Sequence, residues 1–386
     1  MPGVSFGDNG GMTSASHSSA SAEPFEGLRI RGVAKTFGTD TTVLNEIDLD
    51  VHPGELISLV GSSGTGKSTL LRIIAGLEEP SAGRVTYAGQ PLERGSVGVV
   101  FQRPILYPHL SVKDNILFPT RLGAFAGRVD MDYYRELLEA LKLDGLESRK
   151  PSQLSGGQAQ RVGIARALIR RAPVVLFDEP LASVDEEMSA SIRADIVRLH
   201  ERYGFTGLYV THDQNEALML GQRVAVMDAG YLVQVDTPER LLAHPHTLQV
   251  AKLLAAPALN LVALEDSAVL PAGCELAIRA TALYPVAADA AHSLPVQVLG
   301  SRHLVGGMLY RARLLEAVSL PLESRRASAD SELSARMYAR VRAGQELEFF
   351  IPDAQGGTSL SVGDRVHLGV AAERCFLFSE GKRFYL

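Results

Sequence analysis

This sequence has few cysteines, no long apolar run and no excess of positive charge. The chain holds two cysteines, Cys274 and Cys375, which form neither a disulfide framework nor a metal-binding pattern and fit a reducing cytosol. Apolar residues make up 46% of the 386 residues, yet no run approaches the roughly 18 that a membrane-spanning helix needs. The formal net charge is −6, so no overall basic field favours nucleic acid as a partner. The length suggests about two or three domains, each able to bury a core.

Residues 1–27 are rich in Ser, Gly and Ala, with neither a basic start nor an apolar core. This composition excludes a secretory signal and predicts a disordered N-terminal extension, with a translation start at Met12 as an alternative. The alternation of apolar and polar residues at 47–51 predicts a half-buried strand. We therefore expect ordered structure to begin near Leu28.

A glycine-rich stretch matches the pattern G-x-x-x-x-G-K-[ST] of a phosphate-binding loop. Its residues are Gly61, Ser62, Ser63, Gly64, Thr65, Gly66, Lys67, Ser68 and Thr69. Residues 56–60 predict a buried strand before the loop, and residues 69–75 predict a helix after it that ends at Gly76. In such a loop the backbone N–H groups form an anion nest, Lys67 reaches the terminal phosphates and Ser68 holds Mg²⁺. The stretch predicts a nucleotide site.

Polar side chains follow three further predicted strands. Residues 97–101 lead to Gln102, residues 174–178 end in Asp178 and are followed by Glu179, and residues 207–211 lead to His212. The carboxyl ends of strands are where ligands meet open α/β sheets. A lone glutamine at a strand end is usually a surface residue, and a lone histidine there is usually structural. Beside a phosphate loop, a role in the nucleotide site is favoured over these alternatives. We expect Asp178 behind the direct ligands of Mg²⁺, Glu179 as general base and His212 on the γ-phosphate. Gln102 could reach Mg²⁺ or the attacking water.

The region between these strands predicts a helical insert. Leu137, Leu138 and Leu141 recur at helical spacing between Asp132 and Leu143. The insert leads into the sequence Leu154, Ser155, Gly156, Gly157 and Gln158, after which we expect a helix to open at Ala159. Two adjacent glycines and a serine at a helix start predict a second anion nest.

Together these residues resemble the ATP-binding cassette (ABC) family of transporter ATPases, over roughly residues 28–262. The matching positions are the loop at 61–69, Gln102, Leu154–Gln158, Asp178, Glu179, Asp185 and His212. The resemblance implies an α/β P-loop NTPase cassette with a helical subdomain at about 103–157, using ATP and Mg²⁺. It also implies that Phe37, 24 positions ahead of Gly61, stacks on adenine, with a core aromatic as the alternative.

The resemblance further implies a head-to-tail dimer, in which residues 155–158 of one cassette face the ATP held by the loop of the other. The apolar, proline-punctuated segment Arg103–Leu110 would grip a membrane-embedded permease subunit. Such a protein works at the cytoplasmic face of the inner membrane and is served indirectly by an extracytoplasmic solute-binding protein. No nucleic acid is expected as a partner.

The segments 106–112 and 238–261 are similar to those of the importer subgroup whose best-known member is the maltose importer's ATPase subunit. That subgroup appends a small regulatory β-barrel of oligonucleotide-binding type, also called a TOBE or MOP domain. Short alternating runs at 296–298, 346–350 and 366–370 suit its strands, so we predict this domain at residues 263–386. Two features depart from the sugar importers of that subgroup. Sugar importers usually have Ile-Arg-Pro-Glu where this chain has residues 278–281 with Ala280 and Thr281, and the arginine-rich stretch 319–342 looks like an insertion.

We therefore predict the ATP-hydrolysing subunit of a binding-protein-dependent importer. Subgroup resemblance favours a carbohydrate, while polyamine, sulfate, iron and phosphonate-type solutes stay open. The alternative is a soluble ABC ATPase of translation or DNA repair, although those proteins usually carry paired cassettes or a long coiled-coil insert. An exporter half is disfavoured because no transmembrane segment is fused to the cassette.

Overall fold

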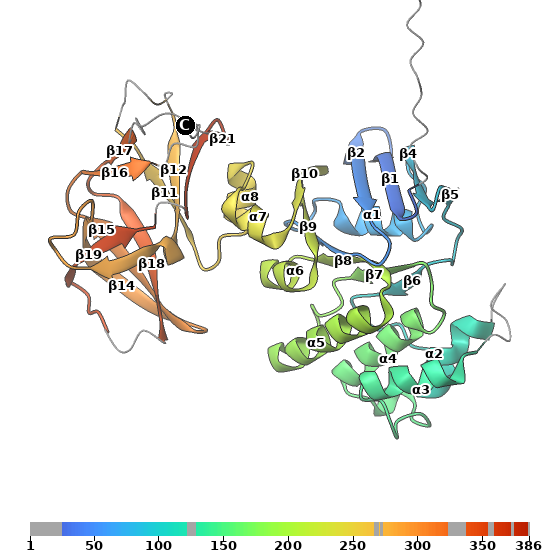
Figure 1. Ribbon diagram of the computed structural model, residues 1–386. Helices are drawn as coiled ribbons and strands as arrows, with labels where there is room; N and C mark the ends of the chain where they lie inside the picture. The colour runs from blue at the N-terminus through green and yellow to red at the C-terminus, as the bar shows by residue number, and fades with distance from the viewer. Residues whose placement is uncertain are drawn as a thin grey trace, which may run out of the picture.

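The computed structural model describes residues 25–121, 129–265, 270, 273–322, 337–353, 359–371 and 374–384. Nearly all of the predicted N-terminal extension lies outside these ranges. The first described strand begins at Leu28, as expected. A cassette half and a C-terminal β half lie side by side, joined through two short helices (Figure 1).

The strands of the cassette half are β1 (Leu28–Phe37), β2 (Thr41–Val51), β3 (Leu56–Val60), β4 (Ala82–Tyr87), β5 (Gln90–Pro91), β6 (Gly98–Val100), β7 (Val174–Asp178), β8 (Thr206–Thr211), β9 (Arg223–Asp228) and β10 (Tyr231–Asp236). Its helices are α1 (Lys67–Ile74), α2 (Val112–Leu117), α3 (Met131–Ala140), α4 (Gly156–Leu168), α5 (Glu186–Tyr203), α6 (Gln214–Leu220), α7 (Pro238–Ala243) and α8 (Leu248–Leu253), with 3₁₀ turns η1 (Phe118–Arg121) and η3 (Pro151–Gln153). These bounds agree closely with the predicted strands at 56–60, 174–178 and 207–211.

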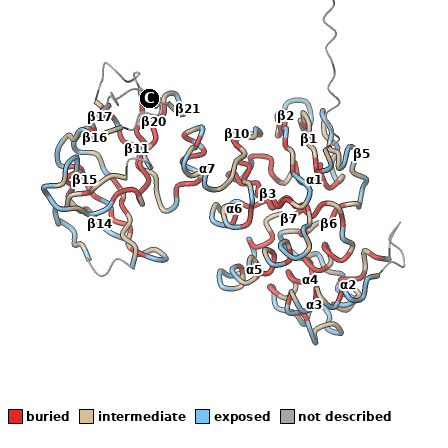
Figure 2. The backbone as a smooth tube through the Cα atoms, in the orientation of Figure 1, coloured by how far each residue is buried: buried red, intermediate tan, exposed pale blue. Residues whose placement is uncertain are grey.

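A six-stranded sheet, in the order β10-β9-β3-β8-β7-β6, forms the centre of the cassette. All neighbouring pairs in it are parallel except β10 with β9. β3 is buried along its whole length, as strands covered on both faces are. One face packs on β1, β2 and α1, the other on α4 and α5 (Figures 1 and 2). Because the strands are parallel, their carboxyl ends share one edge.

The helical subdomain lies against one side of this sheet. The predicted helix at 132–143 is present as α3, where Leu137 and Leu138 are buried and Asp130 accepts hydrogen bonds at the N-terminus. The helix expected to open at Ala159 is α4, and it begins three residues earlier, at Gly156. The expectation was wrong because a serine cap held both glycines inside the first helical turn despite their low helix propensity.

In the described residues of the C-terminal half, the named elements are strands and the turn η4 (Ala280–Ala282). Its strands are β11 (Leu259–Ala263), β12 (Glu275–Arg279), β13 (Leu283–Val286), β14 (Leu294–Leu304), β15 (Gly307–Leu314), β16 (Val318–Leu322), β17 (Met337–Val341), β18 (Glu346–Pro352), β19 (Arg365–Val370), β20 (Cys375–Ser379) and β21 (Lys382–Phe384). Five strands form the sheet β13-β19-β14-β15-β18, four form β11-β12-β20-β21, and β16 pairs with β17. The edge strands β13 and β18 of the five-stranded sheet approach one another, as the predicted barrel requires.

Two details differ from the expected domain map. β11 pairs with β12, so strand pairing of the C-terminal half begins at Leu259 rather than at residue 263. The stretch 319–342, expected as an insertion, supplies β16 and β17, and its middle lies outside the described residues. Sequence alone could not place these strands because the pattern of a short strand does not show which strand it pairs with.

Helix α8 joins the two halves through apolar contacts on both of its sides. Val250, with Leu254 just after the helix, packs against the cassette core. Leu248 and Ala251 pack against Phe376 and other residues of the C-terminal sheet. Backbone bonds from Leu248 N to Gly381 O and from Arg383 N to His246 O, at 2.8 and 2.9 Å, tie the same region together. The connection is therefore a packed interface.

Candidate nucleotide-binding and hydrolysis site

The phosphate loop spans the gap between β3 and α1, and two of its glycines are required by close backbone contacts. A Cβ on Gly61 would lie 2.4 Å from the carbonyl oxygen of Met227. Gly66 has a φ of 97°, and a Cβ there would lie 2.8 Å from the carbonyl oxygen of Val43. The N-cap residue of α1 is Gly66, and no side chain forms a capping hydrogen bond there, so this helix start is open to an external acceptor. This geometry suits an anion.

Lys67 lies inside the loop. Its Nζ donates to the carbonyl oxygens of Gly61 and Ser62, both at 2.9 Å, and the side chain is buried. Burial lowers the pKa of Lys67, while the nearby carboxylates of Glu179 and Asp178 act in the opposite direction. An ammonium group held here lies where the terminal phosphates of a nucleotide bind such a loop.

Ser68 and Asp178 meet across the sheet edge. The Ser68 hydroxyl donates to Oδ1 of Asp178 at 3.2 Å. Burial raises the pKa of Asp178, as does the neighbouring Glu179, and the Ser68 hydrogen bond opposes that rise. A hydroxyl and a carboxylate are hard oxygen donors of the kind that Mg²⁺ prefers. The pair fits the predicted Mg²⁺ position.

Glu179 and His212 form the second polar pair at this edge. His212 Nδ1 lies 2.9 Å from Oε2 of Glu179, and the imidazole is more than half exposed. Glu179 has a φ of 44°, a left-handed conformation that an ordinary residue adopts only where its surroundings enforce it. Its N–H donates to the Val210 carbonyl at 2.9 Å, which fixes this turn against β8. The two predicted residues, 33 positions apart, are thus brought together.

Glu216, which sequence reasoning missed, holds the turn that carries His212. Its buried carboxylate accepts from the hydroxyls of Thr211 at 2.8 Å and Tyr209 at 3.1 Å. Thr211 in turn accepts from the N–H of Asp213 at 3.0 Å. The available signal was the pattern Asp213-x-x-Glu216, typical of a helix start.

Gln102 stands at the same edge, exposed, just beyond β6. β6 pairs in parallel with β7, so Gln102 follows the strand beside that of Asp178. The buried Gln160, also missed, donates through Nε2 to the carbonyl of Phe101 at 3.2 Å and fixes the approach to Gln102.

The turn at residues 155–158 is not brought to the phosphate loop of its own chain. Ser155 Oγ accepts from the Gln158 N–H at 3.2 Å, and Gln158 Oε1 accepts from the Ser155 N–H at 3.0 Å. A Cβ on Gly157 would meet Met188 of α5 at 2.6 Å, while one on Gly156 would meet open space. This side of the turn is free to face another molecule.

Phe37 lies at the exposed end of β1, with 43% of its surface accessible. Lys35 Nζ stands 4.8 Å from the ring centroid. β2, which pairs with β1, touches the phosphate loop at Val43 beside Gly66. Its exposure argues against a core aromatic, and stacking on adenine stays a prediction.

The segment Arg103–Leu110 presents apolar side chains and is held from behind. Ile105 is 64% exposed. Asn115, buried and missed by sequence reasoning, accepts from the Tyr107 N–H at 2.7 Å and donates to the Tyr107 and Leu110 carbonyls. Arg166 donates to the Ile105 carbonyl at 2.6 Å. The segment is therefore an exposed but fixed surface.

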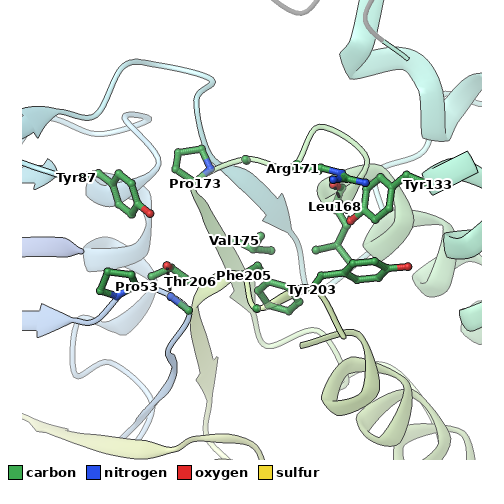
Figure 3. Close-up of a pocket in the computed structure, with 13 residues that line it drawn as sticks. Pro53, Tyr87, Tyr133, Leu168, Arg171, Pro173, Val175, Tyr203, Phe205 and Thr206 are labelled. Carbon is green, nitrogen blue, oxygen red and sulfur yellow. Dashed lines mark hydrogen bonds between the residues drawn. The ribbon is translucent and has the colours of Figure 1, made fainter. Parts of the chain in front are cut away.

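A cavity of about 320 Å³ opens at the opposite edge of the central sheet (Figure 3). Pro53, Pro173 and Thr206, which line it, come just before or at the start of β3, β7 and β8. Tyr133 and Tyr203 close its other side. It lies at the amino ends of the strands and is separate from the nucleotide site.

A phosphate loop, a hydroxyl–carboxylate pair and a glutamate–histidine pair at one sheet edge define a P-loop nucleotide-binding protein. The family model "ABC transporter" matches residues 44–182. The chain belongs to the ABC transporter ATP-binding proteins, a family of ATPases. Across the described residues, no helix is both long enough and apolar enough to cross a membrane.

Several known proteins are similar to this chain. The sn-glycerol-3-phosphate import ATP-binding protein UgpC 1 of Rhizobium johnstonii is 44% identical over 241 residues, which cover 61% of this chain and 65% of that protein. The UgpC of Yersinia pestis is 42% identical over 252 residues, 64% of this chain and 70% of that protein. The structure of CbiO1 of Clostridium perfringens, part of the ABC transporter complex CbiONQ, matches with a TM-score of 0.51 and 27% identity, over 57% of this chain and 92% of that one. The chain thus spans about two thirds of these curated relatives.

Proposed function

We propose that this chain is the ATP-hydrolysing subunit of a binding-protein-dependent importer, at the cytoplasmic face of the inner membrane. The observation that carries the proposal is the convergence of Ser68–Asp178 and Glu179–His212 beside the phosphate loop. Positioning and charge stabilisation are what phosphoryl transfer requires of a protein, and this edge supplies both.

ATP binds with its phosphates in the loop of residues 61–69. The backbone N–H groups and the start of α1 surround the β- and γ-phosphates, and Lys67 turns from the loop carbonyls towards them. Mg²⁺, when bound, neutralises charge on the phosphate oxygens. Ser68 would bind the ion directly, and Gln102 would lie beside it. Asp178 would position Ser68 by accepting the hydrogen bond of its hydroxyl.

Glu179 acts on the attacking water. The water oxygen bonds to the γ-phosphorus, its proton passes to the Glu179 carboxylate, and the bond to the β-phosphate oxygen breaks to leave ADP. His212 holds Oε2 of Glu179 from one side and contacts the γ-phosphate from the other. Their fixed pairing keeps the carboxylate aimed at the water.

The site is completed by a second cassette. Ser155 and the N–H groups of Gly156 and Gly157 face the ATP of the opposite subunit, which accounts for the open space beside Gly156 within one chain. The segment Arg103–Leu110, exposed and held by Asn115, docks a permease subunit. The C-terminal β half supports the dimer and carries regulation.

The imported solute belongs to the carbohydrates and their phosphate esters. The relatives named above are import proteins for sn-glycerol 3-phosphate, which supports a polyol phosphate over polyamine, sulfate or iron. The solute is selected by the external binding protein and permease, so this chain supplies the energy for uptake.

The proposal is tested by uptake of radiolabelled sn-glycerol 3-phosphate in cells that carry either the wild-type chain or Glu179→Gln as their sole copy. We expect uptake to fall to background in the variant while an unrelated amino acid enters at the normal rate. Normal uptake in the variant would exclude this solute. Normal ATP hydrolysis by the purified variant would exclude the assigned mechanism.

A further inference from the structure

A second cavity, of about 550 Å³, lies where the cassette meets the C-terminal half. From the cassette, Gln214 at the start of α6 and Glu239 of α7 line it. From the C-terminal half, Arg279, Thr281 and Arg374 line it. We call this the junction cavity. Its volume is that of a small-molecule site, and such sites occur preferentially between domains.

Arg279 brings a buried positive charge to this cavity. The guanidinium donates to the carbonyl oxygens of Leu254 at 2.5 Å and Leu242 at 3.2 Å, and it lies 5.5 Å from the ring centroid of Phe376. Across the described ranges, no carboxylate forms an ion pair with it. A buried charge without a counter-charge is costly unless something else compensates it.

Arg374 adds a second positive charge to the lining of the cavity. Burial, followed by the proximity of Arg374, lowers the pKa of Arg279 to about 10. Two guanidinium groups that repel one another around a cavity form a strong recognition element for phosphate or carboxylate groups. The acid among the residues named here, Glu239, is exposed, and His244 also lines the space.

Gln214 brings an unsatisfied polar group to the cavity that the two arginines also line. Its Oε1 is buried and, within the described part of the chain, accepts no hydrogen bond. Buried amides almost always have a partner, and this amide can turn its NH₂ towards an oxygen acceptor. The hydroxyl of Thr281 lines the same space.

We propose that the junction cavity binds a small oxyanion, a metabolite bearing phosphate or carboxylate, between Arg279, Arg374 and Gln214. The anion compensates both guanidinium groups and satisfies the amide. Gln214 follows directly on His212-Asp213, so the anion links the C-terminal half to the helix after the hydrolysis histidine. It is a regulatory ligand whose binding is coupled to the state of the nucleotide site.

The test is isothermal titration calorimetry on the full chain carrying Lys67→Ala, which removes phosphate binding at the nucleotide site. Inorganic phosphate, glycerol 2-phosphate and citrate are titrated separately, with glycerol as the neutral control. Binding of the phosphates alone identifies a phosphate site, and binding of citrate alone identifies a carboxylate site. Adding Arg374→Ala should weaken binding about tenfold or more, because a charge-assisted bond is lost.

Thr281→Glu is the second variant, since it places a negative charge in the cavity without touching Arg279. It should weaken binding by a similar factor. Arg365→Ala, an exposed arginine of the same half that does not line the cavity, is the matched control and should bind normally. Circular dichroism confirms folding of each chain.

Unchanged affinity in both cavity variants, or no binding of any probe tighter than about 10 mM, would overturn the proposal. The assay involves neither hydrolysis nor a membrane partner. Its failure would leave the proposed transport function untouched, and failure of the Glu179→Gln experiment would leave this site untouched.

Discussion

The two halves of the molecule use their polar side chains in opposite ways. At the carboxyl edge of the cassette sheet, Glu179 is held in a left-handed conformation and His212 is largely exposed. In the C-terminal half, Asn260 is buried and its amide bonds the backbones of two sheets, at Ile278 and Glu348. Reactive groups are kept accessible at the cost of local strain, whereas structural ones are satisfied internally. The comparison predicts that substitutions at the cassette edge change ATP hydrolysis, whereas substitutions of buried polar residues in the C-terminal half change stability.

Replacement of Glu179 should give the largest effect. Glu179→Gln keeps the size of the side chain but removes the base, so ATP hydrolysis should fall about 10²- to 10⁴-fold while ATP binding persists. Phosphate release and equilibrium ATP binding measure the two properties. Glu187→Gln, at an exposed position of α5, is the matched control. Hydrolysis by the variant above about a tenth of the wild-type rate would show that Glu179 is not the general base.

Asn260→Ala should act on stability and leave the nucleotide site alone. It deletes bonds of 2.6, 2.8 and 3.1 Å and removes the side-chain partner of backbone groups at Ile278 and Glu348. We expect a loss of about 2–4 kcal/mol in the unfolding of the C-terminal half. Urea denaturation measures it, with Asn45→Ala as control. A weakened dissociation constant for ATP would show that the halves are not separate in function.

Phe37→Ala should weaken ATP binding about five- to hundredfold with little change in the saturated rate. The reason is that stacking of a base on an aromatic ring is worth about 1–3 kcal/mol. Phe37→Tyr should bind normally, and Tyr284→Ala tests an equally exposed aromatic of the other half. Fluorescence titration with a labelled ATP gives the constants. If the alanine variant binds like the wild type, adenine lies elsewhere.

Ser155 allows the smallest and most discriminating test. Ser155→Ala removes the cap of α4 and should lower the free energy of unfolding by about 1 kcal/mol. Ser155→Asp keeps a capping oxygen and should preserve stability, yet its charge should oppose the phosphates of a partner's ATP and reduce hydrolysis. Thermal melts and ATP turnover at several protein concentrations separate these effects. Full activity of the aspartate variant would argue against a role facing ATP.

The nucleotide site was predictable because its residues follow strands in a parallel sheet. Once Gly61–Thr69 fixed one strand end, the strands leading to Asp178 and His212 had to end at the same edge. The start of α4 was missed because Ser155 and Gln158 cap each other around two glycines. Propensity alone disfavours that arrangement.

Residues that act through tertiary partners could not be predicted. Nothing in the sequence marks Asn115 or Glu216 as special. Their roles depend on hydrogen bonds with Tyr107 and Thr211 that form only in the folded chain. The start of the C-terminal half depended on the pairing of β11 with β12, which the pattern of either short strand does not reveal. The position of Arg279 likewise depends on hydrogen bonds to the carbonyls of Leu254 and Leu242, which the sequence does not reveal.

Helix α8 has a mechanical consequence. Because Val250 is embedded in one half and Leu248 in the other, the helix cannot swivel on either side without opening an apolar contact. On its cassette side, Val250 belongs to one apolar cluster with residues of β9 and β10, so the helix connects the C-terminal half with the central sheet. The carbonyl of Met227 in β9 lies against Gly61, so packed contacts run without a break from the C-terminal half to the start of the phosphate loop.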